Sequence, residues 1–175
     1  MPAVYRPVRR LCYATPMRLL AVDFGGRRIG LAVSDATGTI ARPWRTIDAG
    51  ATPRASAAVV AALVAGEATD ADVSDVSAIV VGLPRRLGGE DTDQTGAVRE
   101  FANALAEITH LDIHLQDERL TSHEAEALLA ERERDWRKRK AKLDAVAAAI
   151  ILQDYLDARV RAAATAADNR QDTGC

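Results

Sequence analysis

The sequence predicts an α/β fold, a single domain whose mixed sheet of about five strands is flanked by helices. Two observations predict it: short apolar runs of strand type recur along the chain, and segments of helical character separate the later ones. The length of 175 residues supports one compact core and is too short for two. The predicted strands cover residues 18–24, 29–35, 39–48, 76–84 and 112–118.

The first three strands follow one another without an intervening helix. The run RLLAVDF at 18–24 ends at a glycine pair, and IGLAVSD at 29–35 follows after a short gap, which predicts an antiparallel hairpin. The third strand, at 39–48, contains Pro43. Because proline cannot donate a backbone hydrogen bond, it predicts an edge position or a bulge there.

Helices separate the remaining strands. Thr52 as the N-cap and Pro53 at the first helical position predict a helix through about Glu67. The run VSAIVVGLP at 76–84 is almost continuously apolar, which is typical of a strand covered on both faces. A loop with two glycines then leads to a helix predicted over 94–109.

The C-terminal part of the domain adds one strand and two helices. In DIHLQDE at 112–118, Ile113 and Leu115 alternate with polar residues, which predicts a half-buried strand. Thr121 and Glu124 have the spacing of a capping box and predict a helix start. A basic linker at 132–142 then leads to a helix over 142–160, which is apolar almost all round its first three turns and should be buried.

The domain is expected to span residues 17–160. Residues 1–16 should form a flexible arm, and residues 161–175, which lack large hydrophobic side chains, should be disordered. The N-terminus lacks the apolar core of a secretory signal, so we expect a cytoplasmic location. No apolar run approaches the ~20 residues that span a membrane, so no membrane partner is expected.

Composition excludes several classes of function. A formal net charge of −2 excludes a nucleic-acid binder that is basic over its whole surface, but leaves room for a local basic patch. Aromatic residues make up only 4% of the chain, which argues against a sheet surface that stacks bases. Cys12 and Cys175 alone cannot form a disulfide framework or a thiolate metal site.

Three carboxylates stand at positions where burial is costly. Asp23 closes an apolar strand, Glu118 closes a later one, and Asp144 lies in the most apolar stretch of the chain. If these positions meet in the fold, their oxygens could hold a divalent cation, Mg²⁺ or Mn²⁺ in preference to Zn²⁺.

Each acid also has a purely structural interpretation. Asp23 could be a turn residue, and Glu118 a solvated loop acid. Asp144 could pair with a neighbouring lysine or interact with the N-terminus of its helix.

Four ordered motifs resemble the YqgF family, also called RuvX. They are DFGGRRIGLAVSD at 23–35, GLPRRLGG at 82–89, DERLTSHEA at 117–125 and KLDAVAAAIIL at 142–152. The family is described both as Holliday junction resolvases and as pre-16S rRNA nucleases. The resemblance implies an RNase H-like fold and implies that Asp23, Glu118 and Asp144 are the catalytic acids and metal ligands. It thereby implies a metal-dependent hydrolase of phosphodiester bonds.

The chemistry of such a site needs an activated water and neutralised phosphate charge. Two Mg²⁺ ions about 4 Å apart can meet both needs in an in-line displacement, and Mn²⁺ can substitute. We expect Asp23 to bridge the two ions, with Glu118 and Asp144 completing their coordination.

Basic residues near these acids are candidate nucleic-acid contacts, since the guanidinium fork of arginine matches a phosphate group. Seven basic residues against two acidic ones also make 132–142 the strongest charge feature of the chain, although a solvated linker has the same composition. The candidates are Arg27, Arg28, Arg85, Arg86, Arg119, Arg137, Lys138, Arg139, Lys140 and Lys142.

Several functions remain open at this stage. The glycine pattern after Asp23 also resembles the phosphate loop of the actin and sugar-kinase superfamily, but those proteins need two such domains. A non-catalytic RNA-binding module would keep the same basic residues. Of the two nuclease substrates, we favour pre-rRNA over branched DNA, and the enzyme could meet this RNA on ribosomal precursor particles. The reason is that a resolvase normally needs a homodimer, whereas cutting one RNA strand needs only a monomer.

Overall fold

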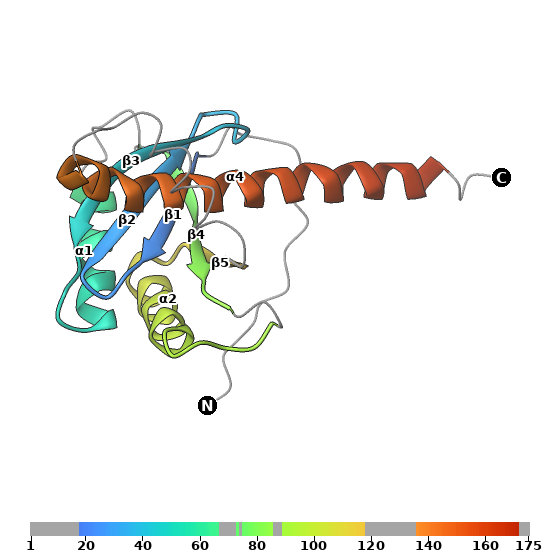
Figure 1. Cartoon of the computed structure of the whole chain (residues 1–175). Coiled ribbons are helices and arrows are strands. Elements are labelled where there is room, and N and C mark those ends of the chain that lie inside the picture. The colour runs from blue at the N-terminus through green and yellow to red at the C-terminus, as the bar shows by residue number, and fades with distance from the viewer. Residues whose placement is uncertain (1–17, 67–72, 74, 86–88, 118–135, 172–175) are drawn as a thin grey trace.

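The computed structural model describes residues 18–66, 73, 75–85, 89–117 and 136–171, with the backbone alone for 136–142 and 166–171. Its elements confirm the predicted α/β fold with a mixed five-stranded sheet (Figure 1). In chain order they are β1 (Arg18–Phe24), β2 (Arg28–Ser34), β3 (Ala41–Asp48), α1 (Pro53–Gly66), β4 (Val76–Leu83), α2 (Thr95–Thr109), β5 (Asp112–Asp117) and α4 (Trp136–Gln171).

The sheet has the strand order β3-β2-β1-β4-β5. Strand β1 pairs antiparallel with β2, as the hairpin prediction required, and β2 also pairs antiparallel with β3, whereas β1, β4 and β5 run parallel. Pro43 lies in the edge strand β3, and the register against β2 shifts beside it, so both expectations for this proline are confirmed. The carboxyl ends of β1, β4 and β5 therefore meet at one edge of the sheet.

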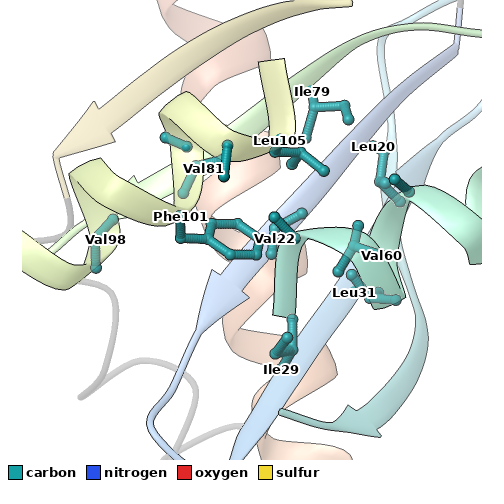
Figure 2. Packing of buried hydrophobic residues seen from close by; sticks show 14 of the residues in the cluster. Leu20, Val22, Ile29, Leu31, Val60, Ile79, Val81, Val98, Phe101 and Leu105 are labelled. Carbon is teal, nitrogen blue, oxygen red and sulfur yellow. The ribbon is translucent and has the colours of Figure 1, made fainter. Parts of the chain in front are cut away.

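Alternation along the strands divides the interior into two cores. Leu20, Val22 and their neighbours pack under α1 and α2 (Figure 2), where Phe101 stacks on Phe24 with ring centroids 4.5 Å apart. Leu19 and Ala21 face the opposite side, where Ile151 and Leu152 of α4 cover them. Both faces of β1 and β4 are thus buried, as the unbroken apolar run of β4 predicted.

The start of α1 follows the predicted capping. The backbone N–H of Ala55 donates to the side-chain oxygen of Thr52 at 3.1 Å, and the helix begins at Pro53. The expected helix start at Thr121 and Glu124 lies outside the described residues, as does the arm at 1–16.

The structure departs from the expected elements at two places. Leu115 is 44% exposed, because β5 is an edge strand with no further strand beside it in the described sheet. Helix α4 begins at Trp136 and runs to Gln171, so residues 136–142 are helical rather than a linker, and residues 161–171 are helical rather than disordered. Lysine, arginine and alanine all favour helix, which explains both extensions. No described helix is apolar enough over a sufficient length to cross a membrane.

Helix α4 contacts the sheet most closely at Gly30 of β2. A Cβ atom added to Gly30 would lie 1.8 Å from the backbone oxygen of Asp144, a separation that atoms cannot adopt. The glycine therefore lets the backbone of α4 rest directly on β2.

Replacement of this glycine tests the contact. Gly30→Ala should lower the free energy of unfolding by about 3 kcal/mol or more, because backbone atoms must separate to admit the methyl group. Gly26→Ala, in the adjoining turn where an added Cβ meets nothing within 4 Å, is the control and should change it by about 0.5 kcal/mol or less. Denaturant titrations in which both variants lose the same stability would contradict the contact.

Candidate active site

Two of the three predicted acids meet on one face of the sheet. Asp23 lies directly opposite Gly30 in the antiparallel pairing of β1 with β2. Directly opposed residues point to the same face, and Gly30 faces the backbone of Asp144. Asp23 and Asp144 therefore lie on the α4 side of the sheet, beyond the buried pair Ala21 and Leu19 on that face.

The electrostatics of the two acids differ. Burial raises the pKa of the Asp23 carboxyl from 3.8 to about 6, and the neighbouring negative charge of Asp144 adds to the rise. Asp144 has a cationic partner, since Nε of Arg28 lies 2.9 Å from its Oδ2. The side chains of this ion pair are 31% and 26% exposed. The carboxylate of Asp144 is thus stabilised by Arg28, whereas the charged form of the Asp23 carboxylate is destabilised by its surroundings.

This donor set fits a divalent cation. Carboxylate oxygens are the ligands that Mg²⁺ and Mn²⁺ prefer, and a cation placed between the two acids would offset both the burial and the repulsion that raise the pKa of Asp23. Within the described residues, no three His, Cys, Asp or Glu side chains come together. The described part of the site is therefore the Asp23–Asp144 pair.

The third acid, Glu118, lies outside the described residues. It directly follows Asp117, the last residue of β5. Since β5 runs parallel to β4, and β4 to β1, the chain leaves β5 at the same sheet edge at which β1 ends after Asp23.

The predicted nucleic-acid contacts have different positions. Arg27 is exposed in the turn between β1 and β2, Arg28 is already paired with Asp144, and Arg85 follows β4 and is partly buried. Arg86 and Arg119 lie outside the described residues. The basic residues at 137–140 and 142 lie on the first turns of α4, the helix that carries Asp144, and only their backbone is described.

Sequence reasoning missed the role of Gly30 and the pairing of Arg28 with Asp144. Gly30 is a glycine inside an apolar strand, a pattern that signals close backbone approach, and that signal was available in the sequence. Arg28 was named as a candidate nucleic-acid contact, which stays a prediction, and the structure also pairs it with Asp144. Nothing in the sequence around Arg28 or Asp144 indicates that these two residues pair.

Comparisons with known proteins agree with the resemblance of the motifs. The family model described as "RuvX: Holliday junction resolvase" matches residues 17–158. A protein of Chloroflexus aurantiacus is 44% identical over 141 residues, which cover 81% of this chain and 87% of the relative. A protein of Koribacter versatilis is 40% identical over 142 residues, covering 81% and 88%. Both relatives carry the name "Putative pre-16S rRNA nuclease".

A solved structure supports the fold. RuvC of T. thermophilus, in complex with a Holliday junction substrate, is 16% identical and superposes with a TM-score of 0.50, covering 82% of this chain and 96% of that one. This likeness concerns the arrangement of elements alone, and it confirms the expected RNase H-like fold.

The raised pKa of Asp23 makes the stability of the metal-free protein depend on pH. Between pH 3.8 and about 6 the folded protein keeps a proton that the unfolded chain loses, so stability falls as pH rises through this range. In EDTA, Asp23→Asn should therefore be more stable than the wild type by about 3 kcal/mol at pH 7.5, and by about half as much at pH 5.

Denaturant titrations at both pH values measure this difference. Asp75→Asn replaces an exposed acid one residue before β4 and should leave stability almost unchanged. A wild type that is more stable than Asp23→Asn at pH 7.5 would contradict the account of the site.

Proposed function

Because this chain belongs to the RuvX family, we propose that it is a metal-dependent nuclease that hydrolyses phosphodiester bonds and processes the 5′ end of pre-16S rRNA in the cytoplasm. The observation that carries the proposal is the Asp23–Asp144 pair at the carboxyl edge of the parallel strands. The names of the relatives supply the substrate, and precursor particles of the ribosome are where the enzyme would meet it.

The proposed metal ligands are Asp23, Asp144 and Glu118. One or two Mg²⁺ or Mn²⁺ ions held there would neutralise phosphate charge and lower the pKa of an attacking water. Asp23 contributes a carboxylate whose charged form is destabilised by burial and by the negative charge of Asp144. Arg28 holds the carboxylate of Asp144 in place through their 2.9 Å ion pair, so its contribution to substrate binding is indirect.

The substrate backbone would approach along the basic residues. Arg27 lies in the turn that follows β1, and Arg85 follows the end of β4. In the sequence, Arg86 is next to Arg85 and Arg119 is next to Glu118. Arg137, Lys138, Arg139, Lys140 and Lys142 precede Asp144 on α4, within about two helical turns. A strand bound by this run would lead toward the carboxylates.

A second candidate function is resolution of four-way DNA junctions, which the description of the family model favours. Symmetric cutting of two strands calls for two active sites related by a two-fold axis, and hence for a homodimer. One active site suffices to process one RNA strand, so a monomer could perform the first function.

Cleavage assays test the nuclease directly. A labelled single-stranded RNA spanning the precursor 5′ end and a four-way DNA junction would be incubated with Mg²⁺, Mn²⁺ or EDTA. We expect metal-dependent cutting of the RNA, reduced about a hundredfold or more in Asp23→Asn and Asp144→Asn, because several kcal/mol of transition-state stabilisation is lost. Asp75→Asn, an exposed acid beside the start of β4, should cut like the wild type.

Each other outcome assigns a different function. Symmetric cutting of the junction would identify a resolvase. Wild type that binds RNA without cutting it would replace the nuclease by a non-catalytic RNA-binding module.

The basic residues of α4 can be tested through salt dependence. Replacement of Arg137, Lys138, Arg139 and Lys140 by glutamine keeps helix propensity and should weaken RNA binding, with the slope of log affinity against log salt shallower by about 2 to 3. Arg159→Gln with Arg161→Gln, on the exposed far half of α4, is the control. An unchanged slope in the fourfold variant would show that the run makes no phosphate contacts.

A further inference from the structure

The connection from β4 to α2 leaves the sheet beside the candidate active site. Val81 of β4 pairs with Val22 of β1 in parallel register, so Gly82 is level with Asp23. Arg85 follows three residues later, within about 10 Å along the strand direction. Gly82 therefore borders Asp23 on the β4 side, whereas Arg28 lies on the β2 side.

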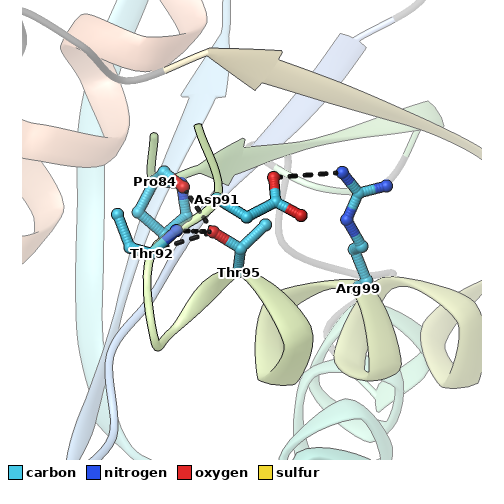
Figure 3. Close-up of polar contacts among 5 residues, drawn as sticks. All are labelled: Pro84, Asp91, Thr92, Thr95 and Arg99. Carbon is cyan, nitrogen blue, oxygen red and sulfur yellow. Dashed lines mark hydrogen bonds and ion pairs between the residues drawn. The ribbon is translucent and has the colours of Figure 1, made fainter. Parts of the chain in front are cut away.

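The hydroxyl of Thr95 ties the two ends of this connection together (Figure 3). It donates a hydrogen bond to the carbonyl oxygen of Pro84 at 2.7 Å and accepts one from the backbone N–H of Thr92 at 2.8 Å. Thr95 is only 1% exposed, although it is polar and begins a helix. A buried hydroxyl that satisfies two backbone groups fixes the path of the chain, because its loss would leave both groups without partners.

The anchor itself is rigid. Helix α2 packs Val98 and Phe101 into the hydrophobic core on its side of the sheet, so Thr95 begins a helix that is held by core packing. Further along the connection, Asp91 forms a β-bridge with Arg85 and an exposed ion pair with Arg99 at 3.5 Å. This β-bridge therefore fixes the backbone of Arg85 relative to the segment that Thr95 holds in place.

The guanidinium group of Arg85 has a hydrogen-bond donor that is not paired within the described part of the chain. Its Nε is buried and has no hydrogen-bond partner among the described residues. A guanidinium group in that state is costly unless an anion completes its hydrogen bonding. By contrast, Nε of Arg28 forms an ion pair with Oδ2 of Asp144 at 2.9 Å. Arg85, which follows the end of β4, thus has a guanidinium nitrogen without a partner among the described residues, next to the strand that pairs with β1.

We propose that Thr95 is a positioning residue, which holds Arg85 so that its guanidinium group binds a phosphate of the substrate strand on the β4 side of Asp23. This inference rests on the proposed function for the class of ligand, a nucleic-acid backbone. It adds a residue that touches no substrate and acts through the backbone of the connection.

The test measures binding separately from cutting. All variants are made in the Asp23→Asn background, and their affinity for a fluorescent single-stranded RNA is measured by anisotropy in EDTA at several salt concentrations. Arg85→Ala should weaken binding about tenfold, because a charge-assisted contact is lost, and should make the salt slope shallower by about 0.7. Arg54→Ala removes an exposed arginine of α1, paired with Glu107, and should change neither.

Thr95→Val should reproduce the effect of Arg85→Ala, and Thr95→Ser, which keeps the hydroxyl, should restore tight binding. The Thr95→Val, Arg85→Ala double variant should bind no more weakly than Arg85→Ala alone, since a positioning residue has no effect once its target is absent. A residue with a merely structural role would not produce this non-additivity. Thermal melts of every variant identify any that are unfolded at the assay temperature.

The other outcomes overturn the inference. It fails if Thr95→Val binds RNA as tightly as its parent, if the two effects add, or if Arg85→Ala leaves affinity and salt slope unchanged. Should Thr95→Val be unfolded, Thr95→Ser and Arg85→Ala decide alone, and the inference stands only if the first binds normally and the second weakly. Wild type that fails to cut RNA while these binding results hold would overturn the nuclease proposal and leave this inference intact.

Discussion

The candidate site depends on how closely helix α4 approaches strand β2 at Gly30. Any larger residue would place its Cβ against the backbone of Asp144, and the helix would have to move away from the sheet. Because Gly30 also lies opposite Asp23, the same contact sets the separation of two carboxylates that come from distant parts of the sequence. Packing of Ile151 and Leu152 further along α4 holds the helix down against Leu19 and Ala21. The geometry of the candidate site is thus a consequence of core packing on that face.

This arrangement costs stability in the absence of a cation. Asp23 is desolvated and faces a second negative charge, which raises its pKa to about 6, whereas Asp144 is compensated by Arg28. Sites that concentrate like charges are a recognised place where proteins give up stability for function. Burial of β1 and β4 on both faces of the sheet stabilises the fold and offsets this loss of stability. Arg85 on the other flank shows the same feature, a buried polar atom without a partner among the described residues.

Much of the fold could be predicted because its signals are local. The apolar runs of β1 and β4, the proline of β3 and the Thr52 cap each act through near neighbours. The extent of α4 could not, because a run of lysine and arginine has the composition of a linker and also a high helix propensity. Within the site, an acid at a strand end is visible in sequence, but the Arg28–Asp144 pair and the bonds of Thr95 join residues whose proximity only the fold creates. The position of Glu118 stays a prediction.

The most direct test of the central claim, that α4 and the sheet together form a divalent-cation site, is a crystal structure determined with Mn²⁺ at a wavelength where its anomalous scattering is strong. The account predicts an anomalous peak within coordinating distance, about 2.0 to 2.4 Å, of carboxylate oxygens from both Asp23 and Asp144. It also predicts that the peak disappears from crystals of Asp23→Asn. A peak bound to only one of these acids, or none at this edge of the sheet at saturating Mn²⁺, would contradict it.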